Sequence, residues 1–271
     1  MAQLSELASA SCRGKVAQLY SDVFDASFGS TAMGAFKGGD FSTKEFSFAT
    51  KGAPAMTITF APHTKDAATT LFDRVSKRIL QAGNTDILFA IMQDTNASSI
   101  LDAVKKQVQS DKVFTYGVTD KIDKKSKEYS VSLYKPNSLK GIRIAARGIA
   151  NILPPPFGMV PKVDGYAIHH KFVVVNFKGK DPVVYCGSSN LSFDPEQKNG
   201  DNLLEIHDTD IVTAFAIQAL GLVDHYQWRN LELSDKPMYL DDLSKPAKAW
   251  YLPWFEPKDL RNRQRKLYIQ A

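Results

Sequence analysis

Residues 165–177 read GYAIHHKFVVVNF, a short apolar run that begins with two histidines and a lysine. The valines predict a β-strand, in which successive side chains point to opposite faces. His169 and Lys171 would therefore share one face with Val173 and Val175. Because a lysine is almost never buried without a partner, a histidine and a lysine two residues apart favour a catalytic or anion-binding role over packing.

A second predicted strand follows closely, with the sequence VVYCGSSNLS at residues 183–192. By the same alternation, Cys186, Ser188 and Asn190 are expected to share a face. Hydroxyl and amide donors beside a lysine suit the oxygens of a phosphate group. Gly187 would let the backbone approach such a ligand closely. The two strands together therefore predict a phosphate-binding site.

Two carboxylates mark the next predicted strand, at residues 202–207. Asp201 and Glu205 are the first and last residues of the short sequence DNLLE. Either could hold the second ring nitrogen of His169, which would fix the tautomer and orientation of the imidazole. From the residues alone, both stay candidates for this role.

Strands and helices alternate along the chain. Further strands are predicted at residues 46–61, 86–92, 112–118 and 129–134. Helices are predicted at residues 12–28, 64–80, 98–108 and 210–228, with Thr64 as a cap. This order favours an α/β layered fold with partly parallel strand pairing. We expect residues 1–56 to form an N-terminal helix with a loop or hairpin, and residues 57–271 to form the main domain of a single compact unit.

Charge is spread unevenly over the 271 residues. The 34 basic and 29 acidic residues give a net charge of +5. Residues 129–163 contain no Asp or Glu, and their basic side chains are Lys135, Lys140, Arg143, Arg147 and Lys162. This stretch would form either a positive rim beside a phosphate site or a solvated loop face.

Several classes of protein do not fit this sequence. No apolar run reaches about 18 residues, so we expect no integral membrane segment. Residues 1–11 lack the basic cluster and apolar core of a secretory signal. Cys12 and Cys186 are the only cysteines, too few for a disulfide framework, and this usage predicts a cytoplasmic protein.

The two predicted strands resemble the HKD motif of the phospholipase D superfamily. That family's pattern is His-x-Lys, then four residues, then Asp, and later Gly-Ser-x-Asn. The matching positions are His169, Lys171, Gly187, Ser188 and Asn190. A carboxylate eleven residues after the final Asn is usual in the family, and Asp201 lies at that spacing. The resemblance covers roughly residues 57–230.

Two features depart from the family's pattern. Asn176 replaces the motif's Asp, which keeps a hydrogen-bonding group but loses the charge. The segment between Asn176 and Gly187 is also longer than usual, which predicts a longer hairpin turn. Because Asn176 faces away from His169 on the predicted strand, we expect the replacement to matter for structure more than for catalysis.

The resemblance implies a mixed β-sheet flanked by helices on both faces, in a phospholipase D-like fold. It also implies hydrolysis of phosphodiester bonds without a metal or cofactor, through a phosphohistidine formed on His169. Asp201, in preference to Glu205, would orient this histidine. The expected phosphate-binding residues are Lys171, Ser188 and Asn190. The expected supporting residues are Asn176, Gly187 and Glu205.

The family's active site needs two such motifs, and this chain shows one. His63 and Lys65 also read His-x-Lys, but no Gly-Ser-x-Asn follows them, so we interpret His63 as part of a loop before a helix. The resemblance therefore implies either a homodimer that pairs two copies of His169 or a second HKD half. Residues 13–28 resemble the helix that ends the first half of two-motif members.

Three functions remain open at this stage. Phospholipid is the preferred substrate, with the aromatic segment at residues 249–255 as a possible interfacial element. An endonuclease acting on DNA or RNA is the alternative, since single-motif members are often nucleases and the basic stretch suits a polyanion. A binding or scaffold module without activity is the third, supported by Asn176 and the missing second motif.

Overall fold

The computed structural model describes residues 2–29, 36–82, 86–92, 98–110, 113–122, 129–135, 142–145, 168–232, 249 and 251–269. Most of the basic stretch at residues 129–163 lies outside these ranges, so its predicted role is not addressed by the structure. Within them, no helix is both long and apolar enough to cross a membrane.

The described residues contain one sheet of nine strands in the order β1-β2-β9-β8-β7-β3-β4-β5-β6. Only β3 and β4 pair in parallel, and the other neighbours are antiparallel, as the predicted mixed sheet requires. The strands are β1 (Phe46–Phe48), β2 (Ala55–Phe60), β3 (Asp86–Ile91), β4 (Phe114–Ile122), β5 (Tyr129–Tyr134), β6 (Ile142–Ala145), β7 (Lys171–Val175), β8 (Val183–Gly187) and β9 (Asn202–His207).

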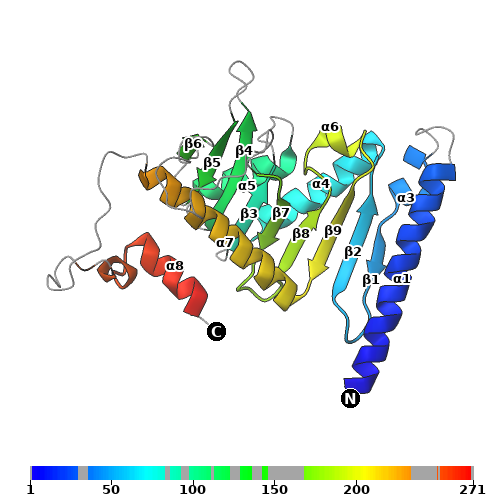
Figure 1. Ribbon diagram of the computed structural model, residues 1–271, viewed down its shortest axis with the longest axis horizontal. Helices are drawn as coiled ribbons and strands as arrows, with labels where there is room; N and C mark the ends of the chain where they lie inside the picture. The colour runs from blue at the N-terminus through cyan, green and yellow to red at the C-terminus, as the bar shows by residue number, and fades with distance from the viewer. Residues whose placement is uncertain are drawn as a thin grey trace, which may run out of the picture.

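Helices cover both faces of the sheet, which confirms the predicted layers (Figure 1). On one face, α4 (Lys65–Leu80) and α5 (Ser99–Ser110) bury an apolar layer against Val173 and Tyr185. On the other, α7 (Thr209–Glu232) packs on Phe172 and Val174. The central strand β7 is thus apolar on both faces, which explains its unbroken run of valines.

The remaining helices lie at the margins of this core. The long helix α1 (Ala2–Gly29) packs on β1 and β2 through Leu19, Ile58 and Phe60 (Figure 1). Two short helices complete this set. α3 (Asp40–Thr43) precedes β1, and α6 (Phe193–Glu196) lies between β8 and β9. Near the end of the chain, η2 (Leu252–Trp254) packs with α8 (Leu260–Ile269).

Two predicted strands have different bounds in the structure. The strand expected at residues 46–61 is a hairpin of β1 and β2, because a turn closed by the Ala53 N–H and the Thr50 carbonyl interrupts it. The expected division between residues 56 and 57 falls inside β2. The strand expected at residues 183–192 ends at Gly187, because the chain turns there toward α6.

Candidate active site

Six of the predicted site residues gather at one end of the sheet, namely His169, Lys171, Gly187, Ser188, Asn190 and Asp201. β7 and β9 begin there, and β3 and β8 end there, beside α6 (Figure 1). The strand register pairs Lys171 with Ile91 and Gly187 with Leu203. Residues just before β7, just after β8 and just before β9 are therefore neighbours, although they are far apart in the sequence.

His169 and Lys171 form the exposed part of this site. His169 lies before β7 and is exposed, and Lys171 is the first residue of the strand. The Lys171 Nζ lies 3.4 Å from each ring nitrogen of His169 and donates a hydrogen bond of 2.9 Å to the His169 carbonyl. Partial burial lowers the pKa of Lys171, while the charge of Asp201 acts in the opposite direction.

The predicted alternation holds for this strand. Val173 and Val175 pack toward α4 and α5, on the same face as Lys171. His170 lies on the other face, where its Nε2 is 3.3 Å from Gln218 Nε2 of α7. Burial, together with the nearby charges of His169 and Lys171, lowers the pKa of His170. The two adjacent histidines thus lie in different environments, and only His169 reaches the exposed side with Lys171.

Gly187 ends β8 with φ +151°, and a Cβ at this position would collide with the backbone oxygen of Asn202. The close approach lets Ser188 and Asn202 exchange hydrogen bonds. The Ser188 N–H donates to Asn202 Oδ1 at 3.3 Å, and the Asn202 N–H donates to Ser188 Oγ at 2.9 Å. The prediction that Ser188 and Asn190 continue the strand alternation with Cys186 is wrong, because the strand ends first.

Two buried oxygens at the site have no hydrogen-bond partner among the described residues, namely Asn190 Oδ1 and Asp201 Oδ2. Buried polar atoms are nearly always paired in folded proteins, because an unpaired one costs about 1–3 kcal/mol. Asn190 follows the turn after β8, and Asp201 precedes β9. Such atoms beside an exposed histidine and a lysine are typical of a site arranged for a ligand.

Glu205, the alternative carboxylate, is engaged elsewhere. Arg74 of α4 donates to its Oε2, and the Tyr185 hydroxyl donates to its Oε1 at 3.4 Å. The same Oε1 lies 3.1 Å from His207 Nε2. These contacts hold Glu205 against α4, whereas Asp201 is the carboxylate whose charge acts on Lys171. The orienting role of Asp201 and the supporting role of Glu205 stay predictions.

Asn176 lies at the opposite end of β7 from His169. It has φ +59°, and its N–H donates to the Asp86 carbonyl at 3.0 Å. The Asp86 carboxylate in turn accepts the N–H groups of Phe177 and Lys178 at 2.8 and 3.2 Å. Asn176 therefore belongs to the hairpin turn between β7 and β8, consistent with the structural role expected for it.

The sequence analysis missed one residue behind the site, Glu196 of α6, which is fully buried. Its Oε2 accepts a hydrogen bond of 2.6 Å from Ser189, and its Oε1 lies 3.5 Å from His63 Nε2. His63 is itself buried, directly before Thr64, whose side chain caps α4 as predicted. No pattern in the sequence marks an acid for burial in a helix of four residues, so only the structure reveals this contact.

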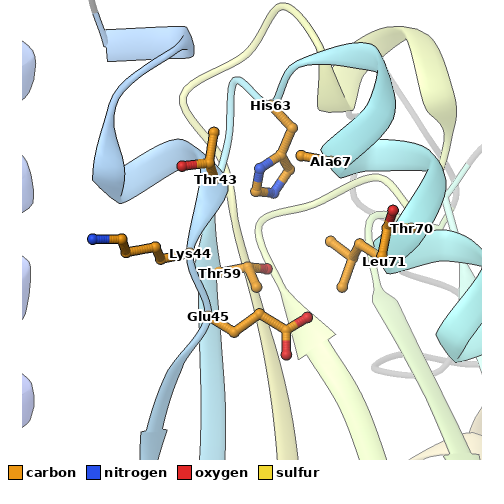
Figure 2. A pocket seen from close by; sticks show the side chains of 8 residues that line it. All are labelled: Thr43, Lys44, Glu45, Thr59, His63, Ala67, Thr70 and Leu71. Atoms are coloured by element: carbon orange, nitrogen blue, oxygen red, sulfur yellow. The ribbon is translucent and has the colours of Figure 1, made fainter.

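A cavity of about 150 Å³ lies beside His63 (Figure 2). Its wall includes Thr43, Lys44, Glu45 and Thr59, which come from the chain before β1 and from β2. Figure 2 shows the His63 ring at one side of this space and the Glu45 carboxylate at another. In the part of the chain that the structure describes, no group of three or more His, Cys, Asp or Glu side chains could hold a metal ion.

Comparisons with known proteins add the following. A scan against models of protein families and a search of curated proteins give no match. A search of solved structures finds NucT from Helicobacter pylori at 15% identity and a TM-score of 0.35, over 61% of this chain and 95% of that one. It also finds Nuc from Salmonella typhimurium, a phospholipase D family member, at 20% identity and a TM-score of 0.34, over 65% of this chain and 93% of that one.

Proposed function

We propose that this chain is a phosphodiesterase of the phospholipase D type with His169 as its nucleophile. The observation that carries the proposal is the exposed His169 imidazole held 3.4 Å from the Lys171 ammonium. Beside this pair, Asn190 and Asp201 keep buried oxygens without partners among the described residues. A cation next to a nucleophile, with polar groups not yet paired, suits an anionic substrate with charge at its reacting centre.

The proposed reaction has two steps. A ring nitrogen of His169 attacks phosphorus, the bond from phosphorus to the leaving oxygen breaks, and that oxygen takes a proton from a second histidine. The second histidine then removes a proton from water, whose oxygen attacks phosphorus and breaks the phosphorus–nitrogen bond. Lys171 and the amide of Asn190 stabilise charge on the phosphate oxygens in both steps, with Ser188 beside them.

The second histidine has to come from outside this motif. We propose that it is His169 of a second copy of the chain, which makes the active form a homodimer. His63 does not serve, because it is buried behind the site and Thr64 next to it caps α4. A second half supplied by another chain is the alternative source, and it predicts an isolated chain without activity.

We favour phospholipid as the substrate. Tyr251 and Phe255 are exposed beside η2, close in sequence to the exposed cations Lys258 and Arg261. Aromatic rings next to basic side chains are typical of segments that lie in a lipid interface. Nucleic acid is the second candidate, because the net charge of +5 favours a polyanion.

Hydrolysis of bis(p-nitrophenyl) phosphate in excess EDTA tests the chemistry. The wild-type chain should release nitrophenol, and His169→Ala should lower the rate by about 1,000-fold or more. His225→Ala, an exposed histidine of α7, is the matched control and should leave the rate unchanged. A wild-type dimer without activity would contradict the proposal and favour a binding module.

Anionic vesicles and single-stranded DNA then separate the two substrates. Phospholipid turnover should depend on the vesicle surface, whereas affinity for nucleic acid should fall steeply between about 50 and 200 mM salt. Cleavage of DNA without hydrolysis of vesicle phospholipid would replace the lipid assignment with the nuclease one.

A further inference from the structure

The turn that carries Ser188 and Asn190 is fixed from behind by a buried carboxyl group. Ser189, between these two residues, is fully buried and donates its hydroxyl proton to Glu196 Oε2 at 2.6 Å. The same Ser189 oxygen accepts the N–H of Leu191 at 3.2 Å. One hydroxyl thus connects Glu196 to the backbone on the far side of Asn190.

This support holds a strained backbone. Leu191 has φ +53° and is fully buried, a conformation that costs a bulky residue about 1–3 kcal/mol. Its N–H goes to Ser189, and its carbonyl accepts the hydroxyl of Ser98, which caps the start of α5. Without Glu196, the Ser189 hydroxyl loses its acceptor, and the turn loses one of the contacts that keep Asn190 in place.

Glu196 is coupled to His63 on its other side. His63 Nδ1 lies 2.5 Å from the Ser42 carbonyl, which can only accept, so Nδ1 carries the proton of the neutral ring. Nε2 is then an acceptor, and it faces Glu196 Oε1 at 3.5 Å. Neither atom has another hydrogen-bond partner among the described residues. A favourable contact between them needs one proton, on the carboxyl group or on Nε2.

We propose that His63 and Glu196 form a buried couple that holds one proton and, through Ser189, positions Ser188 and Asn190 for the phosphate. Both are positioning residues, because neither reaches the exposed side of the site where His169 and Lys171 lie. The inference deepens the proposed phosphodiesterase function and rests on it. It also gives a role to His63, which we do not interpret as part of a second motif.

Burial, more than the surrounding charges, decides where the proton lies. Burial raises the pKa of Glu196 to about 7, the Ser189 hydrogen bond opposes this rise, and the charge of Asp201 adds to it. Burial lowers the pKa of His63, although the Ser42 carbonyl and the charge of Glu45 act against that shift. Both shifts favour the proton on Glu196 at pH values below about 7.

Other charged groups nearby are held by partners of their own. Asp194 and Lys198, on either side of Glu196, form an exposed ion pair with each other. Lys37 donates to the Gln197 carbonyl at 2.9 Å, and Glu45 is paired with Arg74. Lys44 lines the same cavity, but its side chain points away from His63 (Figure 2) and forms an exposed ion pair with Asp40. The cavity, which His63 lines, exceeds the space that a water molecule needs.

The direction of the pH effect follows from the raised pKa of Glu196. Below about pH 7 the carboxyl group keeps its proton and can donate to His63 Nε2. As the pH rises through this value, a carboxylate comes to face the lone pair of Nε2, and the two repel each other. This repulsion should displace the Glu196 side chain, and with it the acceptor of Ser189, so that activity should fall on the alkaline side.

Substitutions of Glu196 test whether the turn needs a protonated carboxyl group or a charged carboxylate at this position. Glu196→Gln keeps an oxygen for Ser189 and supplies an N–H for His63 at every pH. Its kcat/KM at pH 6 should stay within about twofold of wild type, and its alkaline decline should move up by about one pH unit. Glu196→Ala lacks both contacts and should lower kcat/KM about tenfold at pH 6. Asp194→Asn, in the same helix, is the matched control and should keep the wild-type profile.

The outcomes distinguish this inference from the proposed function. An active wild type whose pH profile is unchanged in Glu196→Gln would overturn the couple alone. The couple would also be overturned if Glu196→Gln lost as much kcat/KM at pH 6 as Glu196→Ala does. That result would mean that the turn requires a negative charge at this position. A wild-type protein without phosphodiesterase activity would overturn the proposed function and, with it, this inference.

Discussion

Strand β9 connects two polar clusters that contain similar residues and differ in how they are paired. At its start, Asp201 lies in the candidate site with Lys171 and His169. Four residues later, Glu205 lies in what we call the paired cluster, formed by Arg74, Tyr185, Glu205 and His207. Each has a histidine, a cation and a carboxylate. In the paired cluster both oxygens of Glu205 have partners, whereas Asp201 Oδ2 is buried with none among the described residues.

This difference shows why residue types alone do not identify a site. A buried polar group that is paired contributes about 0.5–1.5 kcal/mol to stability, whereas an unpaired one costs free energy. The hydrogen bonds of the paired cluster therefore contribute to stability, because they hold α4 against the sheet. In the candidate site, the free-energy cost of the unpaired oxygens is not offset within the described residues. This is expected where a ligand supplies the missing partners.

The largest expected contrast is between the two cations. Lys171→Met should lower kcat/KM by about 100-fold, because it removes the charge that stabilises the phosphate oxygens, and should leave stability nearly unchanged. Arg74→Met should leave kcat/KM within about twofold but lower the free energy of unfolding by about 1 kcal/mol, since Arg74 is partly exposed. Steady-state kinetics and urea unfolding of both variants measure the contrast.

The reverse result would remove the distinction between the clusters. If Arg74→Met were the variant with the catalytic loss, the paired cluster would belong to the active site. A stability loss in Lys171→Met with activity retained would make Lys171 a structural residue.

The two carboxylates of β9 allow a matched comparison. Asp201→Asn should lower kcat/KM by about tenfold to thirtyfold, because an amide supports the charge on His169 and Lys171 less well. Glu205→Gln should keep activity within about twofold and lower the unfolding midpoint in urea, because it weakens the bonds from Arg74 and His207. Equal catalytic losses in both variants would contradict the preference for Asp201.

The sequence was sufficient for the parts of this fold that local patterns determine. The valines of β7 and the apolar run of β3 predicted buried strands, and Thr64 predicted the start of α4, because periodicity and capping act over a few residues. The gathering of His169, Lys171 and the turn after β8 also followed from a motif with defined spacing. Where β8 ends did not follow, because the close approach of Gly187 to Asn202 depends on a neighbouring strand.

The contacts of the paired cluster and of the His63–Glu196 couple could not be predicted from the sequence, for the same physical reason. Glu205 meets Arg74 across 131 positions of the chain, and Glu196 meets His63 across an equally non-local contact. No propensity or period encodes which acid finds which partner in a packed core. From the residues alone, Asp201 and Glu205 were therefore equal candidates. The family resemblance preferred Asp201, and the structure gives the two carboxylates different partners.

A smaller effect is expected from the pH dependence of the paired cluster. Hydrogen bonding to Glu205, with a further contribution from Asp181, raises the pKa of His207 despite its partial burial. The contribution of protonated His207 to the free energy of unfolding is thus fully present below the ordinary histidine pKa. It is lost as the pH rises through the raised pKa. His207→Gln should remove this dependence, a difference of a few tenths of a kcal/mol in urea unfolding between pH 6 and 8. An unchanged pH dependence would show that His207 does not titrate with folding.

The smallest effect is expected at the far end of β7, where Asn176 replaces the motif's Asp. It lies seven positions after His169 along the strand, roughly 23 Å at about 3.3 Å per residue. Asn176→Asp should therefore leave kcat/KM within about twofold. It should lower stability by a few tenths of a kcal/mol above pH 6, because the new carboxylate lies near Asp86, whose pKa burial raises to about 6. Kinetics and urea unfolding at pH 5 and 8 measure both. A tenfold gain in activity would instead show that this end of the strand acts on the site, and that the chain is a weakened enzyme whose missing charge matters for catalysis.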